Sequence, residues 1–292
     1  MEEIGTEKKE IEEKVIEEKV IEGNEIKAKG IKIEIKEKQG MPGESGGGPV
    51  DMGAPSGICG ESAECVPDGK GAWDAGYDAV IFDLDGTLLD TLTDLTDSVN
   101  ALMNRYGLEQ YTREQVQSFV GNGIRKLICR VLPGGEHHPQ FQEIYEGFQQ
   151  YYGAHCMDET EPYPGILSLL DGLKKAGIRT AIVSNKADFA VKKLSRVYFG
   201  SLIGVAIGEK EGIRKKPAPD TVNQALEELG VERSRAVYIG DSDVDLETAK
   251  NAGMDVILVS WGFRSREFLL NHGASEDRIA ANVKEVRALL AR

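Results

Sequence analysis

From Tyr77 onward, short apolar runs rich in β-branched residues recur along the chain. Each is bounded by charged or turn-forming positions, a pattern typical of strands buried on both faces of a sheet. Helix-like stretches such as 220–230 and 245–254 lie between most of these runs. The alternation predicts an α/β fold, with a Rossmann-like parallel sheet and helices on both of its faces. The predicted strands are 78–82, 179–184, 203–208, 235–240 and 255–260.

The alternation breaks after the first predicted strand. Residues 91–163 carry helical patterns and no strand pattern. We therefore predict a helical cap over 91–163, inserted into a core formed by 77–90 and 164–292. A cap that closes over the strand ends would exclude water and test the shape of a substrate. Its joints are expected near residues 90–92 and 162–165.

The N-terminal residues 1–76 have a different composition. Residues 1–40 are almost entirely Glu, Lys and Ile, and residues 40–76 are rich in Gly, Pro and Ser. The first composition favours a solvated, weakly structured segment and the second a flexible linker. We predict a disordered extension over 1–76, with an oligomerisation or docking segment as the alternative.

The net charge of the chain limits the kinds of partner that it can bind. The chain has 35 basic and 49 acidic side chains, a net charge of −14. No basic stripe is present for a nucleic-acid backbone, and anionic membrane surfaces would repel the chain. Met1 is followed by acidic residues without a signal-peptide pattern, and the four cysteines lack zinc-type spacing. We expect a cytoplasmic monomer or homodimer without a nucleic-acid or membrane partner.

Polar clusters follow the predicted strands. Asp83 and Asp85 end the first strand, and the strand 179–184 runs into the cluster Ser184-Asn185-Lys186. The strand 235–240 ends before Asp241, with Asp245 four residues later, and Lys216 precedes a proline ahead of a helix. Each cluster alone could be an ordinary turn or helix cap. Because ligands of open parallel sheets bind at the carboxyl ends of the strands, the clusters together indicate one site.

These clusters resemble the four motifs of the haloacid dehalogenase superfamily, in its phosphatase branch with a helical cap. DLDGTLLDT at 83–91 is similar to the first motif, VSNK at 183–186 to the second, KKPAPD at 215–220 to the third and GDSDVD at 240–245 to the fourth. The resemblance covers 77–292 and leaves the extension unexplained. It implies a Mg²⁺-dependent phosphatase.

The resemblance also implies residue roles, which physical chemistry supports. Asp83 would attack phosphorus to form an aspartyl phosphate, and Lys216 would balance its charge. Asp85 would protonate the leaving alkoxide and then deprotonate the hydrolytic water. Ser184, the Asn185 backbone N–H and Thr87 would bind phosphoryl oxygens. The family places Mg²⁺ between the Asp83 carboxylate, the Asp85 carbonyl and Asp241, with Asp245 in support.

The acidic residue at position 85 also limits the kinds of bond that the site is expected to cleave. An alkoxide leaving group needs a proton, so Asp85 favours cleavage of C–O–P esters over C–Cl or C–P bonds. The motifs most resemble those of phosphoglycolate phosphatases, so 2-phosphoglycolate is the expected small-molecule ester. Its carboxylate would be bound by Arg125 or Lys186, with the N–H groups of Asn122 and Gly123 at a helix start.

Other functions stay open at this point. Pyrophosphatases and sugar-phosphate phosphatases keep all four motifs, and a β-phosphoglucomutase-like phosphotransferase uses the same core with another cap. A scaffold protein that works through its charged extension is a hypothesis from another class. Intact motifs argue against it, since a decayed enzyme would be expected to lose at least one of them.

Overall fold

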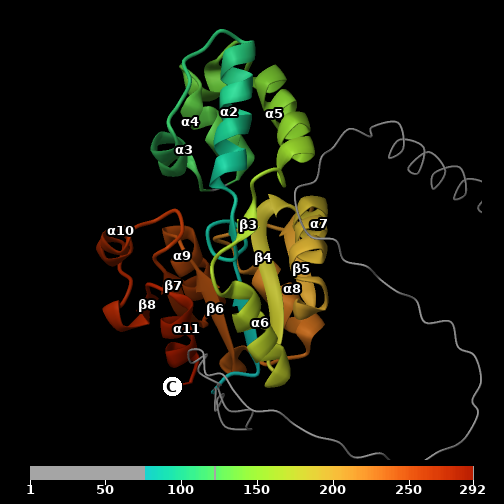
Figure 1. Cartoon of the computed structure of the whole chain (residues 1–292), viewed down its shortest axis with the longest axis vertical. Helices are drawn as coiled ribbons and strands as arrows, with labels where there is room; N and C mark the ends of the chain where they lie inside the picture. The colour runs from blue at the N-terminus through green and yellow to red at the C-terminus, as the bar shows by residue number, and fades with distance from the viewer. Residues whose placement is uncertain (1–75, 122, 292) are drawn as a thin grey trace, which may run out of the picture. The chain divides into compact units, whose positions relative to one another are not determined.

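The computed structural model describes residues 76–121 and 123–291. The prediction of a disordered extension and the site residue Asn122 therefore lie outside the described residues, apart from Gly76. Within them, one parallel sheet has the strand order β5-β4-β1-β6-β7-β8 (Figure 1). The predicted fold class is confirmed. The strands are β1 (Ala79–Phe82), β4 (Arg179–Ala187), β5 (Val205–Glu209), β6 (Ala236–Gly240), β7 (Asp255–Val259) and β8 (Ile279–Ala280).

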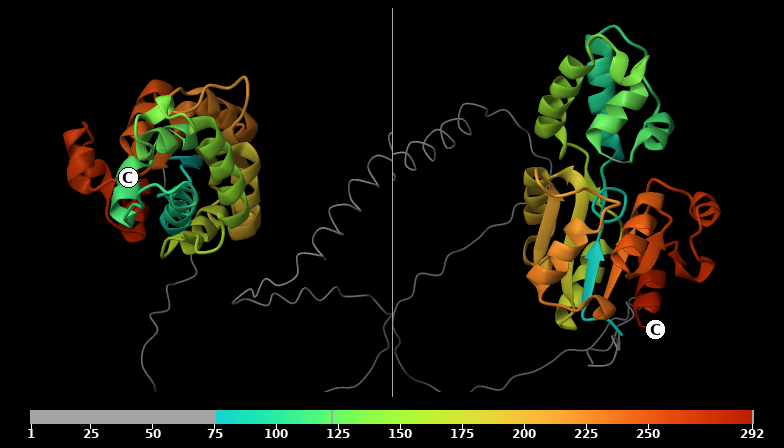
Figure 2. Two further views of the ribbon diagram at one scale, coloured as in Figure 1. Left: turned by 90° about the horizontal axis from the view of Figure 1, so that it is seen from above. Right: turned by 180° about the vertical axis from the view of Figure 1, so that it is seen from behind.

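Helices cover both faces of the sheet, because side chains alternate along each strand. On β1, Val80 and Phe82 pack with α6 (Ile166–Lys175), α7 (Asp188–Tyr198) and α11 (Val283–Leu290). Ala79 and Ile81 point to the other face, which α8 (Asp220–Leu229) and α9 (Asp243–Ala252) cover. Figure 1 shows α6 and α11 in front of the sheet, and the view from behind in Figure 2 brings the other face forward. A short helix, α10 (Arg266–Asn271), follows β7.

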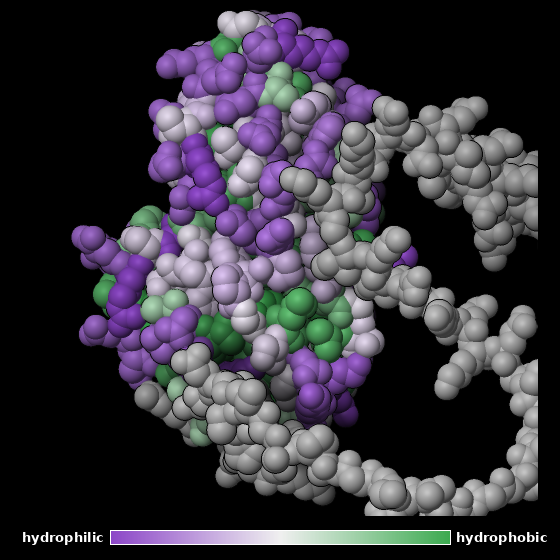
Figure 3. All heavy atoms as spheres, viewed as in Figure 1, coloured by the Kyte–Doolittle hydropathy of each residue, from purple (hydrophilic) through white to green (hydrophobic). Residues whose placement is uncertain are grey.

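A second cluster of helices lies between β1 and β4 in the sequence. Its apolar faces form a hydrophobic core of their own, which includes Val99, Ile128, Ile144 and Phe148. Hydrophilic residues dominate the outer surface of this cluster in Figure 3. The cap thus follows the amphipathic pattern of its sequence. Its helices are α2 (Leu92–Arg105), α3 (Arg113–Phe119), α4 (Ile124–Val131) and α5 (Phe141–His155).

Two short strands connect the cap to the core. β2 (Leu89–Asp90) and β3 (Glu161–Pro162) pair antiparallel at the positions expected for the joints. The buried carboxylate of Asp94 reinforces this neck, because it accepts hydrogen bonds from the backbone N–H groups of Glu159 (2.9 Å) and Thr160 (3.1 Å). The Thr160 hydroxyl donates to the same carboxylate at 2.7 Å. These strands were not predicted from the sequence, since two residues are too few to show a period.

None of the helices among the described residues is both long and apolar enough to cross a membrane.

Candidate active site

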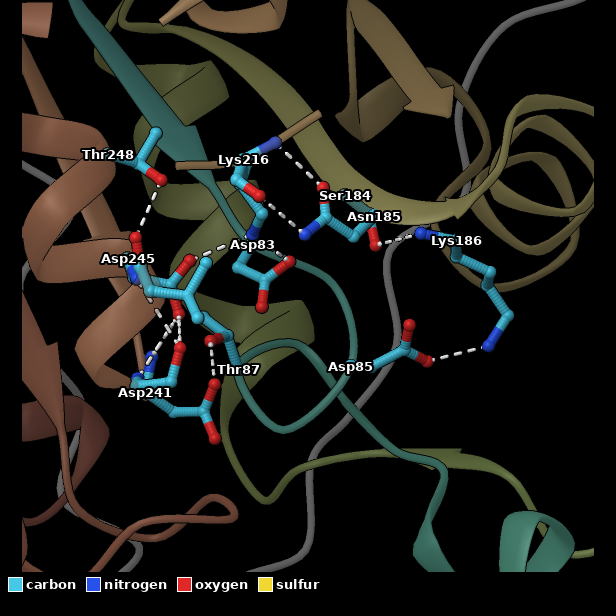
Figure 4. A network of polar contacts seen from close by, with 12 residues as sticks. Asp83, Asp85, Thr87, Ser184, Asn185, Lys186, Lys216, Asp241, Asp245 and Thr248 are labelled. Carbon is cyan, nitrogen blue, oxygen red and sulfur yellow. Dashed lines mark hydrogen bonds and ion pairs between the residues drawn. The ribbon is translucent and has the colours of Figure 1, made fainter. Parts of the chain in front are cut away.

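Neighbouring strands bring the polar clusters of the sequence to one edge of the sheet. β1 lies between β4 and β6 with parallel pairing, so the carboxyl ends of these strands are adjacent. Asp83 follows β1, Ser184 lies near the end of β4, and Asp241 follows β6. Figure 4 shows these side chains with Lys216 around one space. This juxtaposition is what the order of the motifs predicts.

Lys216 is the centre of the core part of the site. Its buried ammonium lies 2.8 Å from Asp83 Oδ1 and 2.8 Å from Asp245 Oδ1, and it donates to the Tyr238 hydroxyl at 3.1 Å. Burial by itself would lower the pKa of Lys216, but the carboxylates of Asp245 and Asp83 hold the pKa well above its ordinary value. Lys216 is therefore a fixed positive charge beside Asp83.

Asn185 holds Lys216 in place, a role that the sequence did not suggest. The Lys216 backbone N–H donates to Asn185 Oδ1 at 2.8 Å, and Asn185 Nδ2 donates to the Lys216 carbonyl at 3.0 Å. The amide side chain thus satisfies both backbone groups of the lysine. The side chain of Asn185 braces the loop before α8, while its backbone stays at the strand end.

Asp245 organises the turn that carries Asp241. Asp245 Oδ2 accepts from the backbone N–H groups of Asp241 (3.2 Å) and Ser242 (3.1 Å) and from the Ser242 hydroxyl (2.5 Å). Ser242 and Asp245 form a capping box at the start of α9. Burial would raise the pKa of Asp245, but Lys216 and these hydrogen bonds hold it below its ordinary value. Asp245 is therefore a charged anchor for both Lys216 and the Asp241 loop.

The buried carboxylates of Asp83 and Asp241 lie among other negative charges, and the site has to offset this repulsion. Burial raises the pKa of Asp83 to about 7, against the opposing effect of Lys216, and Asp245 and Asp85 add to the rise. Burial, followed by the charges of Asp245 and Asp83, raises the pKa of Asp241 well above its ordinary value. Nearby positive charge would lower both pKa values.

The donor set fits a hard divalent cation. Asp83, Asp241 and Asp245 offer carboxylate oxygens that lie within 4.8 Å of one another. Two glycines make room around Asp241, because a Cβ atom on Gly86 or Gly262 would collide with its carboxylate. Oxygen-only ligands of this kind suit Mg²⁺. Among the described residues, Asp83 and Asp241 are the ligands best placed for it, since both line the cavity, whereas Asp245 lies outside the lining and already accepts several hydrogen bonds.

The other end of the site faces the cap. Lys186 donates to Asp85 Oδ1 at 2.7 Å and to the Tyr152 hydroxyl of α5 at 2.6 Å, and all three side chains line a cavity of about 170 Å³. The carboxylate of Asp85 therefore points away from Asp83 and toward Lys186 (Figure 4). Arg130 of α4 and Arg264, which follows β7, also line this cavity.

The structure separates the predicted site residues into two groups. Asp83, Asp85, Gly123, Ser184, Asn185, Lys186, Lys216 and Asp241 line the cavity. Thr87 instead donates its hydroxyl to Asp241 Oδ1 at 3.4 Å, and Asp245 lies behind Asp241. Arg125 is not part of the lining: its side chain is half exposed, lies 3.5 Å from Glu136 and stacks over Phe141.

Sequence reasoning missed Tyr152, Arg130 and Arg264. Tyr152 lies in a helical pattern where an aromatic residue indicates core packing, and it does stack on Phe148. Arg264 donates to the carbonyls of Gln117 (3.1 Å) and Val120 (2.6 Å), which joins the core to the cap. No local pattern distinguishes these residues, because each lies in the site only through contacts between distant segments.

Comparison with known proteins agrees with this geometry. Residues 80–259 match the family described as Haloacid dehalogenase-like hydrolase, so the chain belongs to that family. Within it, the chain is a phosphatase by its relatives. It is 36% identical over 190 residues to the phosphoglycolate phosphatase of Aquifex aeolicus, which covers 63% of this chain and 85% of that protein. The predicted family and enzyme class are confirmed.

Two further comparisons bear on substrate and fold. The N-acetylmuramic acid 6-phosphate phosphatase of Pseudomonas aeruginosa is 31% identical, with 63% of this chain and 82% of that protein covered. A crystal structure from Lactobacillus delbrueckii subsp. bulgaricus has a TM-score of 0.71 and 37% identity, with 74% of this chain and 98% of that chain covered. The chain thus resembles phosphatases of more than one small ester.

Proposed function

We propose that the protein is a Mg²⁺-dependent phosphatase that hydrolyses 2-phosphoglycolate through an aspartyl phosphate on Asp83. The observation that carries the proposal is the contact between Asp83 and Lys216 at the carboxyl end of β1, beside Asp241. The Asp83 carboxylate, the Lys216 ammonium and the Asp241 carboxylate, a candidate metal ligand, all line one small cavity, which supports the proposal. The named activity of the Aquifex relative supports the choice of ester.

Asp83 is the nucleophile in this proposal. One carboxylate oxygen of Asp83 faces Lys216, which leaves the other oxygen to attack phosphorus. Attack forms the acyl phosphate and breaks the bond between phosphorus and the ester oxygen. Lys216 opposes the rise in the pKa of Asp83 and offsets the charge that develops on the phosphoryl oxygens. Ser184 and Asn185 line the cavity, and the Ser184 hydroxyl and the Asn185 backbone N–H would bind those oxygens.

Asp85 is the proton carrier. In-line displacement puts the leaving oxygen on the side of phosphorus opposite the attacking oxygen. Asp85 points away from Asp83, which matches a donor on that side. It would give its proton to the leaving alkoxide and later take one from the water that hydrolyses the acyl phosphate.

Asp83, Asp241 and the backbone carbonyl of Asp85 would hold Mg²⁺, with Asp245 supporting Asp241 from behind. When bound, the ion supplies positive charge that screens the phosphoryl group from Asp83. Chelation should abolish hydrolysis, and added Mg²⁺ should restore it.

The charges that line the cavity suit the substrate. Four acidic and four basic side chains line the cavity: Asp83, Asp85, Asp241 and Asp243, with Arg130, Lys186, Lys216 and Arg264. A bound divalent cation would add two positive charges to this lining. The ionised phosphate and carboxylate of 2-phosphoglycolate carry three negative charges. The cavity is also smaller than the roughly 300–1,000 Å³ pockets of drug-sized ligands.

The carboxylate of the substrate would be bound from the cap end of the cavity. Lys186 and the N–H groups at the start of α4, after Gly123, are the candidates from the sequence that line it. Arg125 is no longer among them, because its guanidinium contacts Glu136 and aromatic rings outside the cavity. Arg130 takes its place in the proposal.

A sugar-phosphate phosphatase is the second candidate, favoured by the likeness to the N-acetylmuramic acid 6-phosphate phosphatase. The test is a comparison of kcat/KM for 2-phosphoglycolate, N-acetylmuramic acid 6-phosphate, hexose phosphates and pyrophosphate. We expect the highest value for 2-phosphoglycolate, and a higher value for a sugar phosphate would replace the proposal. Asp83→Asn should lower kcat at least about 10⁴-fold for every ester, since the covalent route is lost.

A further inference from the structure

Lys186 connects the cap to the proton carrier. Its ammonium is buried at the end of β4 and donates to Asp85 in the core and to Tyr152 in the cap. The two distances, 2.7 and 2.6 Å, are those of strong hydrogen bonds. The Asp85 loop belongs to the core and α5 to the cap, so this single ammonium joins the two parts of the fold.

The direction of these hydrogen bonds follows from the charges. Burial would lower the pKa of Lys186, but Asp85 and Tyr152 hold it above its ordinary value. Burial raises the pKa of Tyr152, which stays a neutral phenol. An ammonium can only donate, so Tyr152 Oη is the acceptor. The bond thus ties the position of Lys186 to an oxygen that moves with the cap.

The cap fixes that oxygen tightly. Tyr152 is buried, its ring stacks on Phe148 with centroids 5.5 Å apart, and both rings belong to the cap core. The Lys186 ammonium also lies 4.7 Å from the centre of the Tyr152 ring. Among the described residues, Lys186 is the side chain that donates a hydrogen bond to the Asp85 carboxylate. The orientation of Asp85 therefore depends on Lys186, and that of Lys186 on Tyr152.

We propose that Tyr152 is a positioning residue that sets the orientation of Asp85 through Lys186, so that the proton carrier is aligned only when the cap is docked. The inference rests on the proposed function, because it takes Asp85 as the proton carrier. With the cap docked, the tyrosine oxygen holds the ammonium between itself and Asp85. With the cap displaced, this partner is lost and Lys186 and Asp85 gain rotamer freedom.

Tyr152→Phe tests the proposal, since it removes one oxygen and keeps the ring and its stacking. The effect should depend on the leaving group, because p-nitrophenolate leaves without a proton and an alkoxide does not. In single-turnover phosphoryl transfer, we expect a fall of about tenfold for 2-phosphoglycolate and less than about twofold for p-nitrophenyl phosphate, with KM little changed. Tyr151→Phe, the same change at an exposed neighbour, is the matched control.

A second measurement separates positioning from a structural role. In an Asp85→Asn background, Tyr152→Phe should cause no further loss, because the residue through which it acts is gone. Equal losses for both substrates, a rise in KM alone, or a full additional loss in that background would each overturn the proposal.

The link between Tyr152 and Lys186 can also be tested without measuring the hydrolysis of an alkyl ester. Tyr152→Phe and Lys186→Met should lower the melting temperature of the whole chain by amounts that do not add in the double variant. Additive losses would overturn the proposed contact. If the wild type hydrolyses p-nitrophenyl phosphate but no alkyl ester, the proposed function fails while this cycle still decides the Tyr152–Lys186 link.

Discussion

The two lysines of the active site have different kinds of partners. Lys216 contacts Asp83 after β1, Tyr238 in β6 and Asp245 in the first turn of α9, all of which belong to the α/β core. Lys186 contacts Asp85 in the core and Tyr152 in the cap. The core half of the site (Asp83, Lys216, Asp241 and Asp245) is thus complete within the α/β core. The cap half (Asp85, Lys186, Tyr152 and Arg130) exists only where the cap contacts that core.

The two halves of the site would therefore serve different steps of the reaction. In the proposed mechanism, charge neutralisation and nucleophilic attack depend on groups that the α/β core holds, whatever the cap does. In the same proposal, proton transfer and substrate recognition depend on groups that the cap helps to place. An enzyme built this way can keep its reactive carboxylate prepared while it admits and releases substrate by cap motion. Substitutions in the two halves should therefore fail in different ways.

Among the substitutions that compare the two halves, Lys216→Met in the core half should have the largest effect. The change leaves Asp83 and Asp245 buried without their shared cation, which should cost about 3–5 kcal/mol of unfolding free energy. It should also lower kcat more than about 10²-fold. Urea unfolding and steady-state kinetics measure the two quantities. Lys215→Met is the control, because that exposed lysine forms a surface pair with Glu209 at 3.4 Å. Similar losses in both variants would remove the distinction between the halves.

A smaller effect is expected from Asp94→Asn at the neck of the cap. The amide cannot accept all the bonds that Glu159 and Thr160 give to the carboxylate, at a cost of about 1–3 kcal/mol in unfolding free energy. The core half should survive, so KM for 2-phosphoglycolate should rise while kcat for p-nitrophenyl phosphate changes little. Asp97→Asn, an exposed change on the same helix, is the control. If hydrolysis of 2-phosphoglycolate and of p-nitrophenyl phosphate were both lost, the core half of the site would depend on the neck of the cap.

The smallest effect is expected from Arg125→Ala. The guanidinium is half exposed and lies against Glu136 outside the cavity, so kcat/KM for 2-phosphoglycolate should change less than about twofold. Arg130→Ala is the contrasting variant, because Arg130 lines the cavity and donates to the carbonyls of Phe119 (2.5 Å) and Gly121 (3.0 Å). It should lower kcat/KM about tenfold. If Arg125→Ala lowered kcat/KM more than Arg130→Ala did, Arg125 and not Arg130 would be the residue that binds the substrate carboxylate.

The sequence by itself determined the sheet, the inserted helices and the core half of the site. Buried parallel strands carry a continuous apolar signal, and their carboxyl ends must share an edge, so Asp83, Ser184, Lys216 and Asp241 could be brought together before any coordinates. The shortest strand of the sheet, β8, went unpredicted because Ile279–Ala280 is too brief to show a pattern.

Only the tertiary structure decided the cap half. Arg125 and Arg130 lie on the same short helix, and its rotation and docking, which no local pattern records, put one outside the cavity and the other inside it. Tyr152 has the pattern of a core aromatic residue, and its hydroxyl acquires a partner only because α5 docks over β4. Asn185 was expected to offer its backbone, and its side chain proved to brace Lys216. Strand ends are ordered by local backbone pairing, whereas these contacts depend on how separately packed units meet.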